Sequence, residues 1–409
     1  MIKRLTILFF AMQMCSCIAR SQIAGYPDFE IVESVPVETN LDNPDIRKTH
    51  EVWLEMINGA KKSLDFEEFY VSNKKGEPLE DILNAIVEAG KRGVQIRFID
   101  DNNMHKTYPQ PIDSIGKLKN ISVRIIDFGA LKGGIQHAKY FIVDGEQAFI
   151  GSQNFDWRSL KHIHEIGVRI GKPEAVKIYL DIFNIDWELA DGNQPSHLPG
   201  VLKKTTYNVP LRTLEAPGDT LVFFPTMSPK GLITDSMLWD ETNIVKLIDN
   251  AKHDVMVQVL TYSPEIRQGG MYTVLDSALR SAAARGVRVK LIVSDWSIGK
   301  YVIGYLKNLA SIPNIEVKFT SIPEYSKGYI SFARVEHCKY MVIDSTACWI
   351  GTANWEKGYF YNIRNVGVVV ENSKINRIIR GIFMKSWDGS YSTQIKPDGT
   401  YEVKEHGEK

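Results

Sequence analysis

The sequence predicts an α/β protein built from two duplicated domains, related by a pseudo-two-fold axis, with one site shared between them. Two observations predict this fold class. The chain has 409 residues, which is too many for one ordinary hydrophobic core. The same order of helical, strand and turn patterns also occurs twice along the chain. Each half is therefore expected to form a mixed β-sheet flanked by helices.

The predicted elements follow the same order in each half. A helix leads into an apolar strand, a second helix stops at a glycine before an alternating strand, and a third strand, a hairpin and a last helix complete the unit. The matched segments are residues 60–66 with 251–257, 91–97 with 284–290, 121–124 with 315–318, and 182–187 with 382–387.

The repeat also predicts the domain boundaries. We expect a first domain over residues 22–194, a connection rich in Pro, Thr and Leu over 195–229, and a second domain over 230–409. Residues 1–21 are typical of a signal peptide, with a basic start, a short apolar stretch and a small-x-small cleavage site. The protein is thus expected to be exported, either periplasmic or secreted, or luminal or lysosomal in a eukaryote. An uncleaved anchor or a lipoprotein attached at Cys17 are the alternatives.

Charge and cysteine content exclude several classes of site. The 49 basic and 49 acidic residues give a formal net charge of zero, so overall charge predicts no affinity for nucleic acid, and an anionic substrate must be held locally. Removal of the signal leaves Cys338 and Cys348, which either pair or remain buried thiols. The chain has no CxxC and no HExxH pattern, and we expect neither a metal nor a cofactor.

The sharpest repeat is the pattern HxKxxxxD, followed by a Gly-Ser-x-Asn or Gly-Thr-x-Asn segment. The same offset along the chain separates every matched pair, which excludes coincidence as the source of the pattern. The first copy contains His137, Lys139, Asp144, Ser152 and Asn154, and the second contains His337, Lys339, Asp344, Thr352 and Asn354.

The spacing of these residues places their side chains together. Residues i and i+2 of a strand point to the same face, so His137 and Lys139 project together, as do Ser152 and Asn154 from the returning strand. Asp144-Gly145 is a turn signal between them. Each hairpin is therefore expected to present an imidazole, an ammonium, a hydroxyl and an amide on one side.

Cleavage of a phosphate diester needs such a set of groups. One histidine attacks phosphorus and the other protonates the leaving oxygen. Lys139, Lys339, Asn154 and Asn354 hold the non-bridging oxygens, which removes the need for a metal ion. Asp144 and Asp344 stand in the opposite strand phase from the histidines, so we expect them to fix turns, with Ser152 and Thr352 in supporting positions.

The two motifs resemble the HxKxxxxD signature of the phospholipase D superfamily, and the flanking residues resemble its lysosomal members called phospholipases D three and four. The resemblance implies two phospholipase D-like domains and a 5′-directed exonuclease on single-stranded DNA or RNA that passes through a phosphohistidine. Members of this branch are also linked to lipid transphosphatidylation. The residues that carry the branch resemblance lie at 32–36, 137–160, 333–335, 354–360 and 387–392.

The two halves differ after each motif. Glu165 follows the first motif and could orient His137, whereas Asn365 occupies the matching position of the second half. A carboxylate partner makes an imidazole more basic, which suits a nucleophile. We therefore expect His137 to be the nucleophile and His337 the general acid, in line with the family's use of the first motif.

Several aromatic residues close to the motifs could stack on nucleotide bases or could belong to the domain interface. These candidates for substrate contact are Phe155, Trp157, Trp355, Tyr359 and Phe360.

Three functions follow from the sequence. A nuclease for single-stranded nucleic acid leads, a phospholipase D or transphosphatidylase is the alternative, and a non-catalytic phosphate-binding module is disfavoured by the intact second motif. No obligate protein partner is evident. Both half-sites lie on one chain, which leaves monomer and homodimer open.

Overall fold

A computed structural model describes residues 25–26, 28–192, 205–266 and 269–408. The predicted signal peptide over residues 1–21 lies outside the described residues, as does Cys17. Within the described part of the chain, none of the helices combines the length and the apolar composition needed to cross a membrane.

The first domain is built on a mixed β-sheet. Parallel strands β4, β6 and β7 form one half of it, and antiparallel strands β8, β9, β11, β2 and β1 form the other. The strands, in sheet order, are β1 (Gly25–Tyr26), β2 (Phe29–Ser34), β11 (Glu165–Ile170), β9 (Gln147–Gly151), β8 (Tyr140–Val143), β4 (Ser63–Glu68), β6 (Gln95–Asp101) and β7 (Ile121–Ile126), with β3 (Arg47–Lys48) beside β2. A short pair, β5 (Val71–Ser72) and β10 (Phe155–Asp156), lies apart from this sheet.

The second domain repeats this sheet. Strands β14, β15 and β16 are parallel, and the strands on the other side of β14 are antiparallel to their neighbours. In sheet order the strands are β12 (Leu211–Ala216), β13 (Asp219–Ser228), β19 (Asn365–Glu371), β18 (Ala347–Gly351), β17 (Tyr340–Ile343), β14 (Asp254–Gln258), β15 (Arg288–Ser294), β16 (Ile315–Thr320) and β20 (Ser392–Gln394). The predicted duplicated α/β fold is confirmed.

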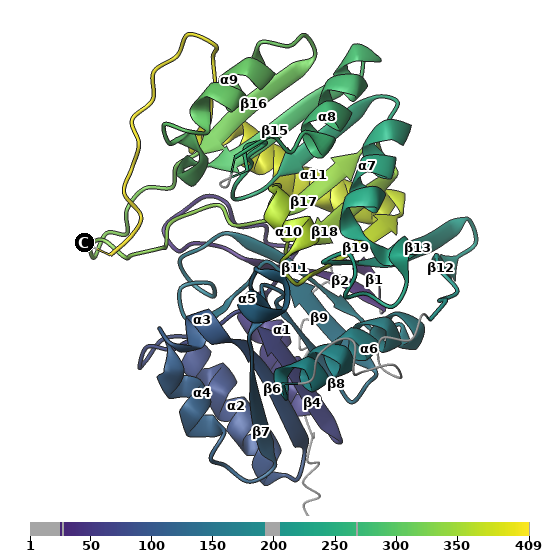
Figure 1. Ribbon diagram of the computed structural model, residues 1–409, viewed down its shortest axis with the longest axis vertical. Coiled ribbons are helices and arrows are strands. Elements are labelled where there is room, and N and C mark those ends of the chain that lie inside the picture. Colours follow the sequence, from purple (N-terminus) through teal and green to yellow (C-terminus); the bar gives the residue numbers. More distant parts are fainter. Residues whose placement is uncertain (1–24, 27, 193–204, 267–268, 409) are drawn as a thin grey trace, which may run out of the picture.

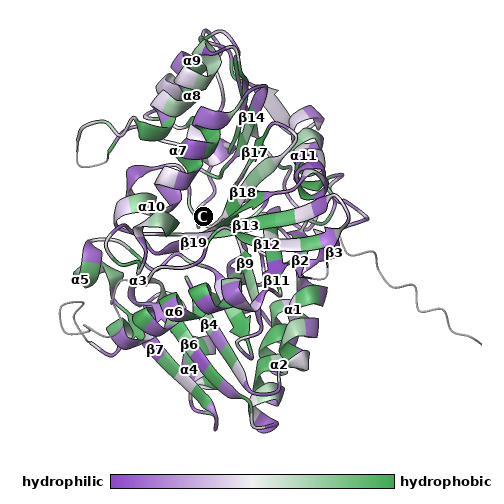
Figure 2. Ribbon diagram, turned by 90° about the vertical axis from the view of Figure 1, so that its right-hand side faces the viewer, coloured by the Kyte–Doolittle hydropathy of each residue, from purple (hydrophilic) through white to green (hydrophobic). Residues whose placement is uncertain are grey.

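Helices cover both faces of each sheet. The outer layers pack mainly through α1 and α2 in the first domain and through α7 and α8 in the second. Figure 2 shows hydrophobic and hydrophilic residues side by side on α1 and α2, as expected for helices with one buried face. The helices are α1 (Thr49–Gly59), α2 (Leu79–Lys91), α3 (Asn102–His105), α4 (Pro109–Ile115), α5 (Phe128–Lys132), α6 (Pro173–Ala190), α7 (Asp240–Asn250), α8 (Val274–Ala284), α9 (Ile303–Ala310), α10 (Lys357–Tyr361) and α11 (Ser373–Asp388).

The prediction of a connection over residues 195–229 is wrong for its second half. Strands β12 and β13 fall inside that range, and β13 pairs along its length with β19. It takes the position that β2 has beside β11 in the first domain. The Pro and Thr residues of this segment suggested a linker, but Pro210 and Pro225 are tolerated near or within strands at the margin of the sheet.

The two domains share a core between their sheets. It joins β8, β9, β11 and α6 of the first domain to β13, β17, β18, β19 and α11 of the second. Figure 1 shows the first domain (purple to blue) below the second (green to yellow), with β11 and β19 between them. A fully buried ion pair reinforces this contact, because Arg364 Nε lies 2.6 Å from Asp186 Oδ2 on α6. The ends of β11 and β19 are thereby fixed at the centre of the molecule.

Candidate active site

In each domain, the residues of the HxKxxxxD motif and of the segment that follows it lie at the two ends of one β-hairpin. In the first domain His137 and Lys139 lie just before β8, while Ser152 and Asn154 lie just after β9. The hairpin turn is formed by Asp144 and Gly145, both with positive φ. The second domain repeats the arrangement around β17 and β18. In each copy the histidine, lysine, hydroxyl and asparagine thus lie at the open end of the hairpin, and the aspartate lies at its turn.

Two short backbone bridges join the hairpins across the pseudo-two-fold axis. His137 N donates to Arg364 O at 3.0 Å, and His337 N donates to His164 O at 2.8 Å. Each bridge runs parallel, one between Gln136 and Arg364 and the other between His164 and Glu336. The residue before each motif histidine therefore pairs with the opposite domain, and the two histidines face a common centre.

Glu165 does not orient His137, and this part of the prediction is wrong. His337 Nδ1 donates to Glu165 Oε1 at 2.6 Å, whereas His137 Nδ1 donates to Asn365 Oδ1 at 3.1 Å. The reason is the parallel bridge of His164 with the second domain, which carries the next residue, Glu165, to the second histidine. Spacing within one half shows nothing of a contact that crosses between halves.

These partners determine the tautomer of the histidines. Asn365 Nδ2 donates to the carbonyl oxygens of Tyr359 and Ile363, at 2.9 and 3.3 Å, which turns Oδ1 toward His137. The Nδ1 of His137 must then carry its proton, because an amide oxygen can only accept. Glu165 imposes the same tautomer on His337. The lone pair of each neutral ring is consequently on Nε2, the atom a phosphate would meet.

Positive charge is concentrated around both rings. Lys139 Nζ donates to His137 O at 2.6 Å, and Lys339 Nζ donates to His337 O at 2.5 Å, so each ammonium group stays beside the histidine of its own motif. All four side chains are buried. Burial, together with the two ammonium groups, holds the pKa of His137 and of His337 well below the usual range.

The same surroundings favour neutral forms of the other charged groups. Burial lowers the pKa of Lys339 to about 7. Burial also lowers the pKa of Lys139, and the Lys339 ammonium adds to that effect. Burial raises the pKa of Glu165 even though both lysines oppose the change. A buried site whose histidines and lysines are held toward their neutral forms favours an anion, because the negative charge of a bound anion stabilises their protonated forms.

The remaining motif residues divide between site and scaffold. Asn154 is buried and its Oδ1 is without a hydrogen-bond partner, while Asn354 Nδ2 donates to Tyr359 Oη at 3.1 Å. Ser152 Oγ accepts from Ile166 N at 3.2 Å. Thr352 Oγ1 donates to Asn365 Oδ1 at 2.9 Å and so supports the partner of His137.

The two motif aspartates serve the fold. Asp144 accepts hydrogen bonds from the backbone N–H groups of residues 61–63, and Asp344 accepts from those of residues 252–254. Each carboxylate therefore joins a hairpin turn to the start of the neighbouring strand, at the end of the hairpin away from the histidines.

Three of the five aromatic candidates for substrate contact are wrong. Phe155, Trp355 and Phe360 are at most 1% exposed and belong to the cores of their domains. Phe155 lies in β10, Trp355 in an isolated bridge with Tyr262, and Phe360 in α10. Which of their side chains point inward depends on these short elements, which the sequence after a Gly-x-x-Asn segment does not reveal. Trp157 is half-buried, with its ring 5.6 Å from that of His162.

Tyr359 is the aromatic candidate that the structure brings to the site. Its ring centroid lies 5.2 Å from that of His137, and Phe69 approaches the same imidazole at 5.0 Å. The sequence did not identify Phe69 as a site residue. Its signal is its position directly after β4, because ligands gather at the carboxyl ends of parallel strands. Phe69 and Tyr359 form an aromatic wall around the first histidine.

One group of possible metal ligands occurs among the described residues, but its members satisfy one another. It consists of His164, Glu336 and Cys338. His164 Nδ1 donates to Glu336 at 2.5 Å and Nε2 donates to Glu33 at 2.8 Å, so both ring nitrogens carry protons. The thiol of Cys338 donates to His164 O, and burial raises its pKa. Cys338 and Cys348 are both free thiols.

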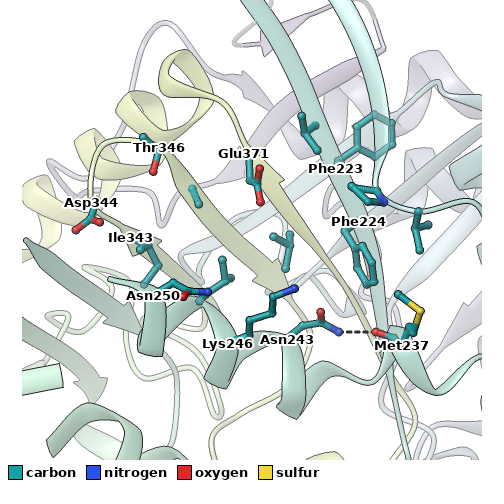
Figure 3. A pocket seen from close by; sticks show the side chains of 16 residues that line it. Phe223, Phe224, Met237, Asn243, Lys246, Asn250, Ile343, Asp344, Thr346 and Glu371 are labelled. Carbon is teal, nitrogen blue, oxygen red and sulfur yellow. Dashed lines mark hydrogen bonds between the residues drawn. The ribbon is translucent and has the colours of Figure 1, made fainter. Parts of the chain in front are cut away.

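The hollow drawn in Figure 3 is separate from the catalytic centre. It measures about 340 Å³ and lies between α7 and the sheet of the second domain, with Phe224, Lys246 and Glu371 in its lining. Its other members include Asp344, at the opposite end of β17 from His337. Because the length of β17 separates the two, the residues of this hollow do not contact the histidines.

Comparison with known proteins agrees with this geometry. The family model described as "Cardiolipin synthase, PLD-like domain" matches residues 53–187 and 244–387, one match for each domain. Among curated proteins, phospholipase D Z of Dictyostelium discoideum is 31% identical over 385 residues, covering 90% of this chain and 90% of that protein.

Other relatives of similar identity have different names. The virion nicking-joining enzyme of vaccinia virus strain Western Reserve is 31% identical and covers 89% of each chain. The 5'-3' exonuclease PLD3 of Xenopus laevis is 32% identical, over 89% of this chain and 80% of its own.

Among solved structures, phosphatidylserine synthase of Haemophilus influenzae aligns with a TM-score of 0.60 at 13% identity and covers 84% of each chain, a likeness of fold. Two family matches, two complete HxKxxxxD motifs and one buried centre shared by both domains lead to the same conclusion: this chain belongs to the phospholipase D superfamily, within which it resembles the PLD3-like branch, and it is a phosphodiesterase.

Proposed function

We propose that this phosphodiesterase is a 5′-exonuclease on single-stranded DNA or RNA that acts without a metal ion and through a phosphohistidine. The observation that carries the proposal is the pair of buried imidazoles in one site, each with its Nδ1 proton held by the opposite domain. Two lysine ammonium groups beside them supply the positive charge that a phosphate diester needs.

The unequal partners of the histidines assign their roles. His137 faces a neutral amide, which leaves its Nε2 unprotonated and free to attack phosphorus. His337 is backed by Glu165, which favours its protonated form once a phosphate anion has entered and offset the lysines. His137 therefore remains the nucleophile and His337 the general acid, as the sequence predicted. The reason is the opposite one, because the carboxylate of Glu165 stabilises the protonated form of the acid and does not activate the nucleophile.

The reaction then runs in two balanced steps. His137 Nε2 forms a bond to phosphorus while the bond to the leaving oxygen breaks, and that oxygen takes its proton from His337. A water molecule next gives a proton to His337 and attacks phosphorus, and the bond to His137 breaks. Lys139, Lys339 and the two motif asparagines hold the non-bridging oxygens throughout.

The relatives favour nucleic acid as the substrate. The name of the Xenopus relative specifies an exonuclease and its 5'-3' direction, and the viral relative is named a nicking-joining enzyme. The aromatic wall of Phe69 and Tyr359 beside His137 suits a flat base. Phospholipid headgroup release remains the second candidate, because a relative of similar identity is named phospholipase D.

Export and a single-chain active unit complete the proposal. The basic and apolar pattern of residues 1–21 supports passage through a membrane followed by cleavage. Both half-sites belong to one chain, so catalysis requires no second copy.

The test is digestion of a 3′-labelled single-stranded oligonucleotide in EDTA by the protein from Gln22 onward. We expect progressive shortening from the 5′ end that survives chelation. His137→Ala and His337→Ala are each expected to lower the rate by at least about a thousandfold, as losses of catalytic groups do.

Lys246→Met, in the hollow of Figure 3, is the matched control and should digest the oligonucleotide like the parent protein. An oligonucleotide left intact at every pH, with choline released from phosphatidylcholine micelles, would instead establish the phospholipase.

A further inference from the structure

The second domain contains a pocket of about 520 Å³ at the carboxyl ends of β14 and β15. This is the end of the sheet at which His337 and Lys339 lie, because Gln258 pairs with Tyr340. We call it the second-domain pocket. Its lining includes Thr261, Tyr262, Glu265, Trp296, Tyr301 and Glu356.

Thr261 connects this pocket to the catalytic centre. Its backbone N–H donates to Asn354 Oδ1 at 3.4 Å, and its hydroxyl donates to Glu356 Oε1 at 2.5 Å. Asn354 in turn donates to Tyr359, whose ring lies against His137. A group bound in the pocket would therefore adjoin the phosphate held by the motif residues.

The internal repeat shows that the first domain has filled the matching space. Thr261 follows β14 as Tyr70 follows β4, and Glu356 follows Asn354 as Asp156 follows Asn154. In the first domain Tyr70 Oη donates to Asp156 at 2.9 Å, and Arg158 Nη2 lies 2.6 Å from the same carboxylate.

The second domain lacks the groups that do the filling. Threonine replaces the tyrosine, and Gly358 stands where the first domain has Arg158. These two exchanges remove a ring and a guanidinium, so the Glu356 carboxylate lies at the wall of an open pocket. The carboxylate at this position is therefore buried and paired with an arginine in the first domain, as Asp156, and lines an open pocket in the second, as Glu356.

The lining of the pocket selects the chemistry of its ligand. Among the described residues that line the pocket, the charged ones are Glu265 and Glu356, and both are acidic, which disfavours a phosphate. Trp296 and Tyr301 both line the pocket with aromatic rings. The Trp296 ring has His406 as a neighbour, with centroids 5.3 Å apart, and Tyr301 is 79% exposed. Flat faces beside a hydrogen-bond acceptor suit a planar ring that carries an amino group.

We propose that the second-domain pocket binds the base of a nucleotide next to the scissile phosphate, by stacking on Trp296 and Tyr301 and by a hydrogen bond from an exocyclic amino group to Glu356. This inference rests on the nuclease function proposed above. It makes Glu356 a specificity-determining residue that favours cytosine over uracil, since the two bases differ in their donor and acceptor groups at C4 and N3.

The test compares oligonucleotides that carry deoxycytidine or deoxyuridine at the first or the second position from the 5′ end and are otherwise identical. At one of these positions, kcat/KM of the parent protein should be about tenfold higher for deoxycytidine, as expected for a hydrogen bond to a charged group. Glu356→Gln should abolish this ratio, because an amide both donates and accepts. Tyr301→Ala should raise KM for both oligonucleotides alike.

The matched control is Glu371→Gln, which removes the same charge in the hollow of Figure 3 and should keep the tenfold ratio. Cleavage with equal kcat/KM for both bases at both positions would overturn the pocket assignment and leave the nuclease standing. A ratio that Glu356→Gln does not change would overturn it as well. If no oligonucleotide is cut, the nuclease proposal fails and the pocket assignment falls with it.

Discussion

His137 and His337 occupy equivalent positions, and they differ most in the group that accepts the Nδ1 proton. An amide oxygen of Asn365 faces the first ring and a carboxylate of Glu165 faces the second. A carboxylate stabilises an imidazolium, whereas an amide does so only weakly. Two residues of one type can thus carry out opposite proton chemistry within one site.

This difference predicts how each histidine responds to the leaving group. His337→Ala should cleave a nucleotide p-nitrophenyl phosphodiester at close to the parent rate in the first turnover, because p-nitrophenolate leaves without a proton. His137→Ala should release none, since no bond to phosphorus forms. A stopped-flow measurement of the p-nitrophenolate burst checks this prediction.

The opposite result would exchange the roles of the two residues. A burst from His137→Ala and none from His337→Ala would make His337 the nucleophile. Lys246→Met serves again as the control, and its burst should equal that of the parent protein.

Most single residues of the site could be predicted, but their partners could not. The repeated motifs identified both histidines, both lysines and both asparagines because their spacing is local. The pairing of Glu165 with His337 depends on a contact between halves of the chain, which periodicity does not encode. The burial of Phe155 and Trp355 depends likewise on strand phase after a loop.

Each hairpin turn is held in place by one aspartate. Asp144 has a φ of 56° and accepts from three consecutive backbone N–H groups at the start of β4. Burial favours its neutral form, but these hydrogen bonds outweigh that effect and lower its pKa. The hairpin that carries His137 is therefore anchored at its far end.

Asp144→Ala should lower the free energy of unfolding by about 1 kcal/mol, because the backbone donors of residues 61–63 lose a charged acceptor and water replaces it at the exposed ones. Urea denaturation measures the change, and kcat of the folded variant should stay within about twofold because the turn lies far from the histidines. Asp144→Asn should lose less stability, since it keeps one acceptor and tolerates positive φ.

The lowered pKa of Asp144 also fixes the sign of its pH dependence. Its charged form stabilises the fold above the usual carboxyl pKa of about 4, and that contribution is lost as the pH falls below this value. The parent protein should lose more stability between pH 5 and pH 3 than Asp144→Asn does. Equal losses would contradict the role assigned to this carboxylate.

Helices and strands could be predicted where a short run of residues carries the pattern, and they were missed where the structure depends on pairing between distant segments. The parallel strands and their helices followed from runs that end at Gly93 and Gly286, both with positive φ. Strands β12 and β13 were mistaken for a connection because proline-rich composition resembles a linker. β13 takes its place in the sheet by pairing with β19, more than a hundred residues away, and β12 pairs with β13.

At the scale of the whole molecule, two buried cations of different kinds, a guanidinium and an imidazolium, join the domains through ion pairs. Arg364 pairs with Asp186 at one bridge, and His164 lies between Glu33 and Glu336 at the other. Burial opposes a charge on His164, but the two glutamates outweigh it and raise its pKa to about 10. The interface at the catalytic centre thus contains an imidazolium that bridges both domains.

His164→Gln should weaken the interface and change its response to pH. Because the pKa of His164 is raised, its stabilisation is fully present below pH 6.5 and is lost as the pH rises through about 10. At pH 6 the variant should be about 3 kcal/mol less stable than the parent, the usual cost of leaving a buried ion pair without one partner.

Urea denaturation at pH 6, 8 and 10 checks this prediction. The gap between variant and parent should narrow as the pH rises. His50→Gln, at the surface of the first domain beside Asp81, is the matched control and should follow the parent. A gap of constant size would mean that His164 contributes no pH-dependent charge to the interface.

The exchange of partners between the domains has a consequence for the history of the chain. In a dimer of two identical single repeats, symmetry would force one residue type onto both places now held by Glu165 and Asn365, and both histidines would titrate alike. In a single polypeptide that carries both repeats, each place can mutate alone. The proposed division of labour between a nucleophile and an acid is therefore open to a fused chain and closed to a symmetric dimer.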